Sequence, residues 1–224
     1  MTAATPTAPA SAHAPTERPS TLLVYRDDGP LARALGHALP RSLARVPALV
    51  GAVAGVVPLL VVVAVGGDGV SRGVAAAVLA WLVLITGASP DASHSDRMAW
   101  AVPPAVRLGE YVALLWIASL HDGTTQPAAF ALLCALAFRH YDLAYRLRHQ
   151  ASTPAAWVNA VSLGWEGRVV LAFVLLLAGA LPGGYYAWAA IVAVVFVGEA
   201  TVSWVAHARG QRTVDYEDEE DEGQ

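Results

Sequence analysis

Charge, cysteine and lysine are all scarce in this sequence of 224 residues. Charged residues make up 14% of the chain and hydrophobic residues 56%, and the mean hydropathy of +0.48 lies outside the usual range of soluble proteins. Cys134 is the only cysteine, which excludes an internal disulfide, and we interpret it as a small packing residue. Lysine is absent and the net charge is −4, so the composition does not indicate nucleic-acid binding.

The apolar residues are concentrated in long runs. A helix needs about 20 apolar residues to cross a bilayer, because the hydrocarbon core is about 30 Å thick and each residue adds about 1.5 Å. We therefore predict an all-α fold, a polytopic transmembrane helical bundle with about six spans. Gly51 and Gly55 have the spacing that permits close helix packing. The six apolar stretches are 46–65, 74–88, 100–120, 128–138, 169–181 and 185–206.

The chain divides into four regions on this interpretation. Residues 1–21 are an Ala/Pro-rich leader and residues 208–224 an acidic tail, and we expect both to be disordered. The six-helix transmembrane domain occupies residues 46–207.

Residues 22–45 form a juxtamembrane amphipathic segment between the leader and the first span. In this segment Asp28 can cap and Pro30 can open a helix that runs to about Leu39. Its stripe of leucines suits a helix on the membrane surface or a helix packed on the membrane domain.

The positions of the arginines predict an orientation. Basic residues near the ends of spans are retained in the cytoplasm. With six spans and a cytoplasmic start, Arg72 is the one arginine that falls on the outer side. We therefore expect a multi-pass protein of the cell membrane with both termini in the cytoplasm.

Ionisable residues gather at the cytoplasmic ends of the predicted spans. The apolar cores 128–138 and 169–181 are too short to cross a bilayer alone, so their helices must include polar neighbours. Ionisable residues in a membrane are costly unless they pair or face water, so a cluster of them is a candidate functional site. The candidate polar cluster consists of His94, Asp96, Arg97, Arg107, Glu110, His140, Asp142, Arg146, Glu166, Arg168 and Glu199.

One interpretation of the cluster is structural. Arg107 with Glu110, and Asp142 with Arg146, have the spacing of pairs that neutralise each other on one helix face. Arginines near helix ends, such as Arg139, would extend to lipid headgroups.

The other interpretation is functional. The arginines would hold an anionic phosphate or a phospholipid headgroup, and the carboxylates with His94 or His140 would bind a divalent cation. No spacing is diagnostic of one metal, so catalytic residues, metal and cofactor stay unassigned.

Several short segments along the chain carry a distinctive mixture of polar and aromatic residues. They are 25–33 (YRDDGPLAR), 93–94 (SH), 97–100 (RMAW), Pro103, 110–111 (EY), 138–142 (FRHYD), 145–146 (YR) and 164–168 (GWEGR). This pattern, spread over about residues 22–206, resembles a bacterial integral-membrane domain family of unknown function that occurs fused to nucleotidyltransferase and CDP-alcohol phosphatidyltransferase domains. The resemblance implies an accessory role near phospholipid headgroup synthesis and brings no catalytic residues with it.

Residues 28–33 also match the middle of the CDP-alcohol phosphotransferase motif, but the remainder of that motif is missing. Tyr25 stands where the motif has an aspartate, and Ser42, Val46 and Val50 stand where it has a glycine and two further aspartates. Three of the four metal-binding carboxylates are therefore absent, and we do not expect phosphotransferase activity of this class.

The function we favour from the sequence is an integral membrane accessory module for phospholipid headgroup synthesis at the cytoplasmic face. It would bind a lipid headgroup or a partner through the polar cluster, and its partners would be membrane lipids and a CDP-alcohol phosphatidyltransferase or related enzyme. The alternative is a membrane-embedded enzyme that acts on a phospholipid or polyprenyl substrate through Glu110, His140, Asp142 and Glu199. A small transporter is less favoured, because the outer halves of the spans are almost purely apolar and no inverted repeat is visible.

Overall fold

A computed structural model describes residues 21–38, 47–66, 69–88, 98–149 and 153–222, with side chains described except for 21–23, 156 and 210–222. Every regular element in this part of the chain is helical, which confirms the predicted all-α fold. The α-helices are α1 (Thr21–Arg26), α2 (Pro30–Ala38), α3 (Ala48–Gly66), α4 (Arg72–Gly87), α5 (Val102–Ser119), α6 (Gln126–His149), α7 (Ala156–Ser162), α8 (Gly164–Leu177) and α9 (Gly183–Glu222), and short 3-10 turns precede α5 (η3, Ala99–Ala101) and α6 (η4, Gly123–Thr125). The predicted leader lies outside the described residues except for Thr21.

Four helical stretches of the described chain are long and apolar enough to cross a membrane, as expected for a membrane protein. They are Ala48–Gly66, Ala99–Ser119, Trp157–Leu177 and Gly183–Arg209. Large apolar side chains point outward from them; Val194 on α9, for example, is 74% exposed. Such exposure would be unfavourable in water and is normal against lipid.

The two other predicted spans correspond to α4 and α6. Helix α4 has 16 residues, close in extent to the predicted stretch 74–88, and it begins after Ser71, whose side chain caps the first turn by accepting from the N–H of Val74. Helix α6 continues through its polar neighbours to His149, as the short apolar core 128–138 required.

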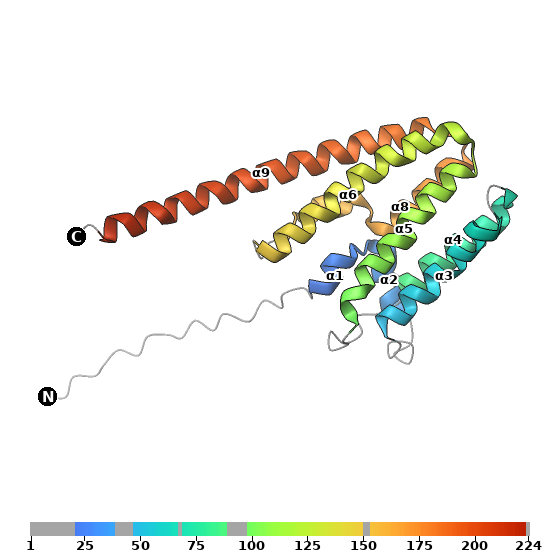
Figure 1. Cartoon of the computed structure of the whole chain (residues 1–224), viewed down its shortest axis with the longest axis horizontal. Coiled ribbons are helices and arrows are strands. Elements are labelled where there is room, and N and C mark those ends of the chain that lie inside the picture. The colour runs from blue at the N-terminus through green and yellow to red at the C-terminus, as the bar shows by residue number, and fades with distance from the viewer. Residues whose placement is uncertain (1–20, 39–46, 67–68, 89–97, 150–152, 223–224) are drawn as a thin grey trace.

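Helix α5 lies at the centre of the bundle. It contacts α3 on one side and α6 and α8 on the others, while α4 pairs with α3, and α9 runs along α6 (Figure 1). The short helices α1 and α2 fold into one end of this arrangement, where α1 contacts α5 and α6 and α2 contacts α4 and α8. The amphipathic segment is therefore packed on the helical bundle, which was one of the two arrangements predicted for it.

Helix α9 continues to Glu222 and so includes most of the predicted acidic tail 208–224. Glutamate and arginine favour helical backbone, and extending an existing helix avoids the cost of nucleating a new one. The apolar span from Gly183 provides that existing helix.

Small residues allow α3 to approach its neighbours closely. Gly51, Ala52 and Gly55 are buried on one face of the helix, as their spacing predicted. A Cβ atom added to Gly55 would lie 2.1 Å from Thr86 Oγ1 on α4. The α3–α4 contact therefore depends on the missing side chain of this glycine.

We predict that Gly55→Val forces α3 and α4 apart and lowers stability by about 1–3 kcal/mol, the usual effect of overpacking. Thermal unfolding in detergent, followed by tryptophan fluorescence, would measure the loss. Gly36→Ala on α2 is the control, because nothing lies within 4 Å of the added Cβ atom. Equal losses in the two variants would contradict the close α3–α4 contact.

Candidate functional site

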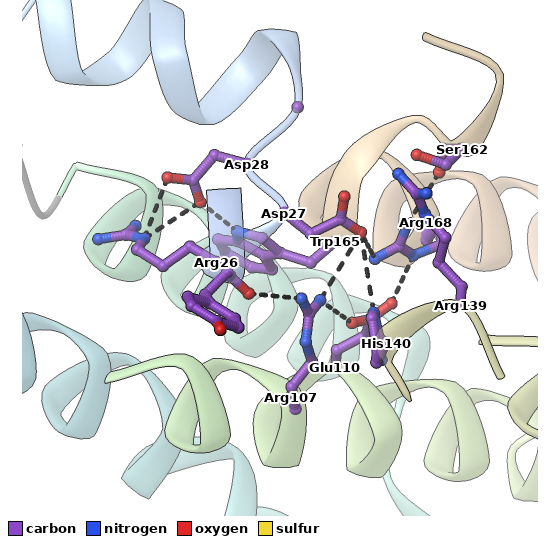
Figure 2. Close-up of polar contacts among 12 residues, drawn as sticks. Arg26, Asp27, Asp28, Arg107, Glu110, Arg139, His140, Ser162, Trp165 and Arg168 are labelled. Atoms are coloured by element: carbon purple, nitrogen blue, oxygen red, sulfur yellow. Dashed lines mark hydrogen bonds and ion pairs between the residues drawn. The ribbon is translucent and has the colours of Figure 1, made fainter. Parts of the chain in front are cut away.

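The polar groups at one end of the bundle converge on Asp27, in the turn between α1 and α2. Its Oδ2 atom lies 2.8 Å from Nη2 of Arg168 on α8, 3.7 Å from Nη1 of Arg107 on α5, and 3.8 Å from Nε2 of His140 on α6. Figure 2 shows these side chains pointing toward one another from three helices and the turn. Asp27 is buried, so its charge depends on these partners.

Glu110 on α5 is the second carboxylate of this central network. Its side chain is fully buried and contacts Nε of Arg168 at 2.5 Å and Nη1 of Arg107 at 3.5 Å. The Arg107–Glu110 contact joins residues three apart on one helix, as the sequence predicted. Arg168 also donates to the carbonyl of Ser162 at 3.0 Å. The guanidinium of Arg168 therefore joins α5, the α7 end and the α1–α2 turn.

The turn itself is fixed by side chains on both sides of Asp27. Arg26 pairs with Asp28 at 3.0 Å and donates to the carbonyl of Thr86 on α4, and the indole of Trp165 donates to Asp28 Oδ1 at 2.8 Å. Arg107 donates to the carbonyl of Tyr25 at 2.7 Å. These contacts hold the turn against α4, α5 and α8 at once.

Two glycines permit the closest approach of the turn to α8. Gly164 has a positive φ of 68°, and a Cβ atom on it would lie 2.2 Å from the backbone nitrogen of Gly29. The approach brings the Glu166 carboxylate to the first turn of α2, where it accepts from the N–H groups of Gly29 and Ala32, each at 3.1 Å. Glu166 therefore caps α2 from a distant part of the sequence and complements the positive end of its dipole.

A second polar network joins α6 to α9. Arg146 forms a bidentate pair with Glu199, with both N–O distances 2.8 Å, and contacts Asp142 one turn earlier at 2.8 Å. The indole of Trp204 donates to Asp142 Oδ1 at 3.1 Å. This network fastens the polar end of α6 to α9.

Burial and nearby cations act in opposite directions on Asp27. Burial alone would raise the pKa of Asp27, but the Arg168 guanidinium, the nearby His140 imidazole and the Arg107 guanidinium outweigh it and hold the pKa well below the usual 3.8. A carboxyl whose pKa falls on folding stabilises the protein fully above its unfolded pKa. That stabilisation is lost as the pH falls through the lowered value.

The chemistry open to the central network is limited by its internal pairing. Arg107 and Arg168 both face carboxylates, so neither presents a free guanidinium to an anion. In the described part of the chain, no group of three or more His, Cys, Asp or Glu side chains is arranged to hold a metal ion. Three buried atoms of the network, Arg107 Nη1, Glu110 Oε2 and His140 Nε2, have ion-pair contacts but no hydrogen-bond partner within the described residues.

The predicted polar cluster therefore separates into several parts. Arg107, Glu110, His140 and Arg168 meet in the central network, Asp142, Arg146 and Glu199 form the α6–α9 network, and Glu166 caps α2. The remaining three predicted residues, His94, Asp96 and Arg97, lie outside the described residues.

Sequence reasoning missed the centre of the site, Asp27. From the sequence, Asp28 was predicted to cap the helix, and residues 22–45 were placed on the membrane surface or on the membrane domain. No buried partner was predicted for Asp27. A signal was present: 26–28 (RDD) combines one basic and two acidic residues immediately before a Gly-Pro turn, next to apolar residues.

These observations define the chain as an all-helical membrane protein whose spans enclose buried ion-pair networks at one end. It belongs to a family of unknown function, DUF5941, whose model matches residues 18–222. The match confirms the resemblance to a domain family of unknown function, and it includes the α1–α2 turn and both networks. A comparison with curated proteins gave no match, and neither did a comparison with solved structures.

We predict that Asp27→Asn lowers the free energy of unfolding by about 3–5 kcal/mol at neutral pH, because it leaves two largely buried guanidinium groups sharing the single carboxylate of Glu110. The difference in unfolding free energy between Asp27→Asn and the wild type should stay constant above about pH 4. It should become smaller as the pH falls through the lowered pKa of Asp27. Unfolding titrations with denaturing detergent at several pH values would measure it. Asp122→Asn, in an exposed turn, is the control and should cost much less. A pH-independent difference would contradict the assignment of Asp27 as an ionised partner.

For Glu166 we predict a local effect. Glu166→Ala removes both acceptors from the first turn of α2, so the amides of Gly29 and Ala32 should exchange hydrogen faster while those of α3 do not change. Hydrogen–deuterium exchange in nanodiscs would detect this, and Glu166→Gln, which keeps one acceptor oxygen, should have an intermediate effect. Unchanged exchange in α2 would show that the cap does not hold this helix.

Proposed function

We propose that this chain is a multi-pass module of the bacterial cell membrane that assists an enzyme of phospholipid headgroup synthesis at the cytoplasmic face. It would cross the membrane six times, with both termini in the cytoplasm, and would not catalyse a reaction itself. Its partners would be membrane lipids and a CDP-alcohol phosphatidyltransferase or a related enzyme. The pathway and the partner follow from the family resemblance described above.

The observation that carries the non-catalytic role is the internal neutralisation of the charged networks. An enzyme that transfers a phosphoryl group must direct positive charge toward its substrate. Here Arg107, Arg146 and Arg168 each direct their guanidinium groups at carboxylates of the same chain, at distances between 2.5 and 3.7 Å. The favoured role of these networks is therefore to lock helices together.

The positions of the charged residues along their helices support a topology in which successive spans alternate in direction. Arg107 lies in the first part of α5, Arg146 near the end of α6, and Arg168 in the first part of α8. Arg107, Arg168 and His140 of α6 meet around Asp27. The tight turn that joins α5 to α6 lies at the opposite end of these two helices. This arrangement agrees with spans that alternate in direction and keep their charged ends on one side of the membrane.

The lock formed by Asp27, Glu110 and Arg168 would hold α2 as a fixed surface for a partner. Ala32 is buried and Leu35 packs near Gly87 of α4, while Leu31 is 44% exposed and Arg33 is exposed. An exposed leucine two residues from an exposed arginine, on a helix packed against α4 and α8, is suited to a protein contact.

A specific observation also favours a second candidate, the membrane-embedded enzyme. Three buried atoms, one each of Arg107, Glu110 and His140, have no hydrogen-bond partner in the described part of the chain, and a substrate could satisfy such atoms. This candidate predicts turnover by the chain alone.

The two candidates are separated by reconstituting the chain in vesicles that contain CDP-diacylglycerol, with and without a CDP-alcohol phosphatidyltransferase. We expect no turnover by the chain alone, and a photo-crosslinker at Leu31 that captures the enzyme while one at lipid-facing Val194 does not. Asp27→Asn should reduce the capture. Turnover by the chain alone that is lost in a folded His140→Ala variant would contradict the accessory role and support the enzyme.

A further inference from the structure

Arg139 on α6 is a buried arginine with no paired anion in the described part of the chain. Its side chain is 2% exposed, and no described carboxylate lies within the 4.0 Å of an ion pair. It makes a hydrogen bond from Nη2 to Oδ1 of Asn159 on α7, and its guanidinium lies over the ring of Phe196 on α9, 5.3 Å from the ring centroid. The buried Nε atom of Arg139 has no hydrogen-bond partner among the described residues.

The nearest carboxylates are already bound to other arginines. Asp27, Glu199 and Asp142 act on Arg139 electrostatically. Asp27 contacts Arg168 at 2.8 Å, and Glu199 and Asp142 both contact Arg146 at 2.8 Å. Arg139 therefore shares distant charge with both networks, but none of the described carboxylates forms an ion pair with it.

Burying a guanidinium without a paired anion is energetically unfavourable. Removing a charge from water is strongly unfavourable unless a paired anion and hydrogen bonds replace the lost hydration. An amide oxygen and an aromatic face supply only part of that replacement. An acceptor for the Nε–H of Arg139 would complete its hydrogen bonding.

The surroundings of Arg139 suit a phosphate group. A guanidinium presents its N–H groups in a planar fork that matches the oxygens of phosphate, and the bond to a charged acceptor is stronger than one to a neutral acceptor. Asn159 is partly exposed on the short helix α7, so the Arg139–Asn159 pair reaches the surface of the bundle. The Asn159 amide also carries N–H donors for a second phosphate oxygen.

We propose that Arg139 and Asn159 form a binding site for a phosphate group, carried either by a lipid headgroup or by a free anion. The site is separate from the lock, which uses Asp27, Glu110 and Arg168, and it does not depend on the proposed accessory role. Binding fills the hydrogen-bonding capacity of Arg139 and fastens α6 to α7 and α9.

The test measures thermal unfolding of the delipidated protein in a neutral detergent. Inorganic phosphate, short-chain phosphatidylglycerol and, at equal ionic strength, chloride are added separately. We expect phosphate-bearing probes to raise the unfolding midpoint and chloride to have no effect. A rise with inorganic phosphate assigns the site to the phosphate group itself, whereas a rise with the lipid alone assigns it to a headgroup.

Three variants make the test specific. Arg139→Met should lose the response, while Arg148→Met, which removes an exposed arginine from the same helix, should keep it. Asn159→Asp places a carboxylate beside Arg139, so it should raise the midpoint without a probe and abolish the response to phosphate. Asn159→Asp tests the phosphate site even if Arg139→Met does not fold. The proposal is overturned if no phosphate-bearing probe raises the wild-type midpoint, or if Asn159→Asp responds as the wild type does.

Discussion

The ion pair between Asp27 and Arg168 is the contact on which the polar end of this bundle depends. It joins the α1–α2 turn to α8 at 2.8 Å, and both side chains are buried. Glu110 shares the same arginine, so α5 is tied into the pair. Once the turn is held in this way, Gly29 lies against Gly164 and the Glu166 carboxylate reaches the first turn of α2. The ion pair therefore supports α2, a nine-residue helix that is too short to be stable alone.

Buried ion pairs of this kind contribute more to specificity than to stability. Desolvating two charges costs nearly as much as their attraction returns, so a well-packed apolar pair can be as stable. Removing only one partner destabilises the protein, because it leaves the other charge buried and unpaired. In a chain whose spans are so uniformly apolar, helices have few ways to select one register over another. Asp27, Arg168 and Glu110 join defined positions on the α1–α2 turn, α8 and α5, and Arg146 with Glu199 does the same for α6 and α9.

The parts of this structure that follow from local sequence could be predicted, and the parts that follow from long-range pairing could not. The apolar stretches 46–65 and 185–206 correspond to α3 and to most of the apolar part of α9, because hydrophobic length is a local property. The pairs Arg107–Glu110 and Asp142–Arg146 were predictable from their spacing on one helix.

Asp27 and Arg139 were not identified as site residues for different physical reasons. Asp27 lies 141 residues from Arg168 in the sequence, and no local pattern connects the two. Arg139 was expected to extend toward lipid headgroups because it follows a short apolar core, but Asn159 of α7 and Phe196 of α9 cover it. Packing by later helices decides whether an arginine near the end of an apolar run is exposed or buried.

The central claim, that the buried network is a lock between helices, is tested most directly by a double-mutant cycle on Asp27 and Arg168. Asp27→Leu, Arg168→Met and the double variant would be unfolded reversibly in mixed micelles with denaturing detergent. The lock predicts that each single variant is strongly destabilised and that the double variant recovers stability, with a coupling energy above about 1 kcal/mol. Losses that add within about 0.5 kcal/mol would contradict it, because the two side chains would then act independently.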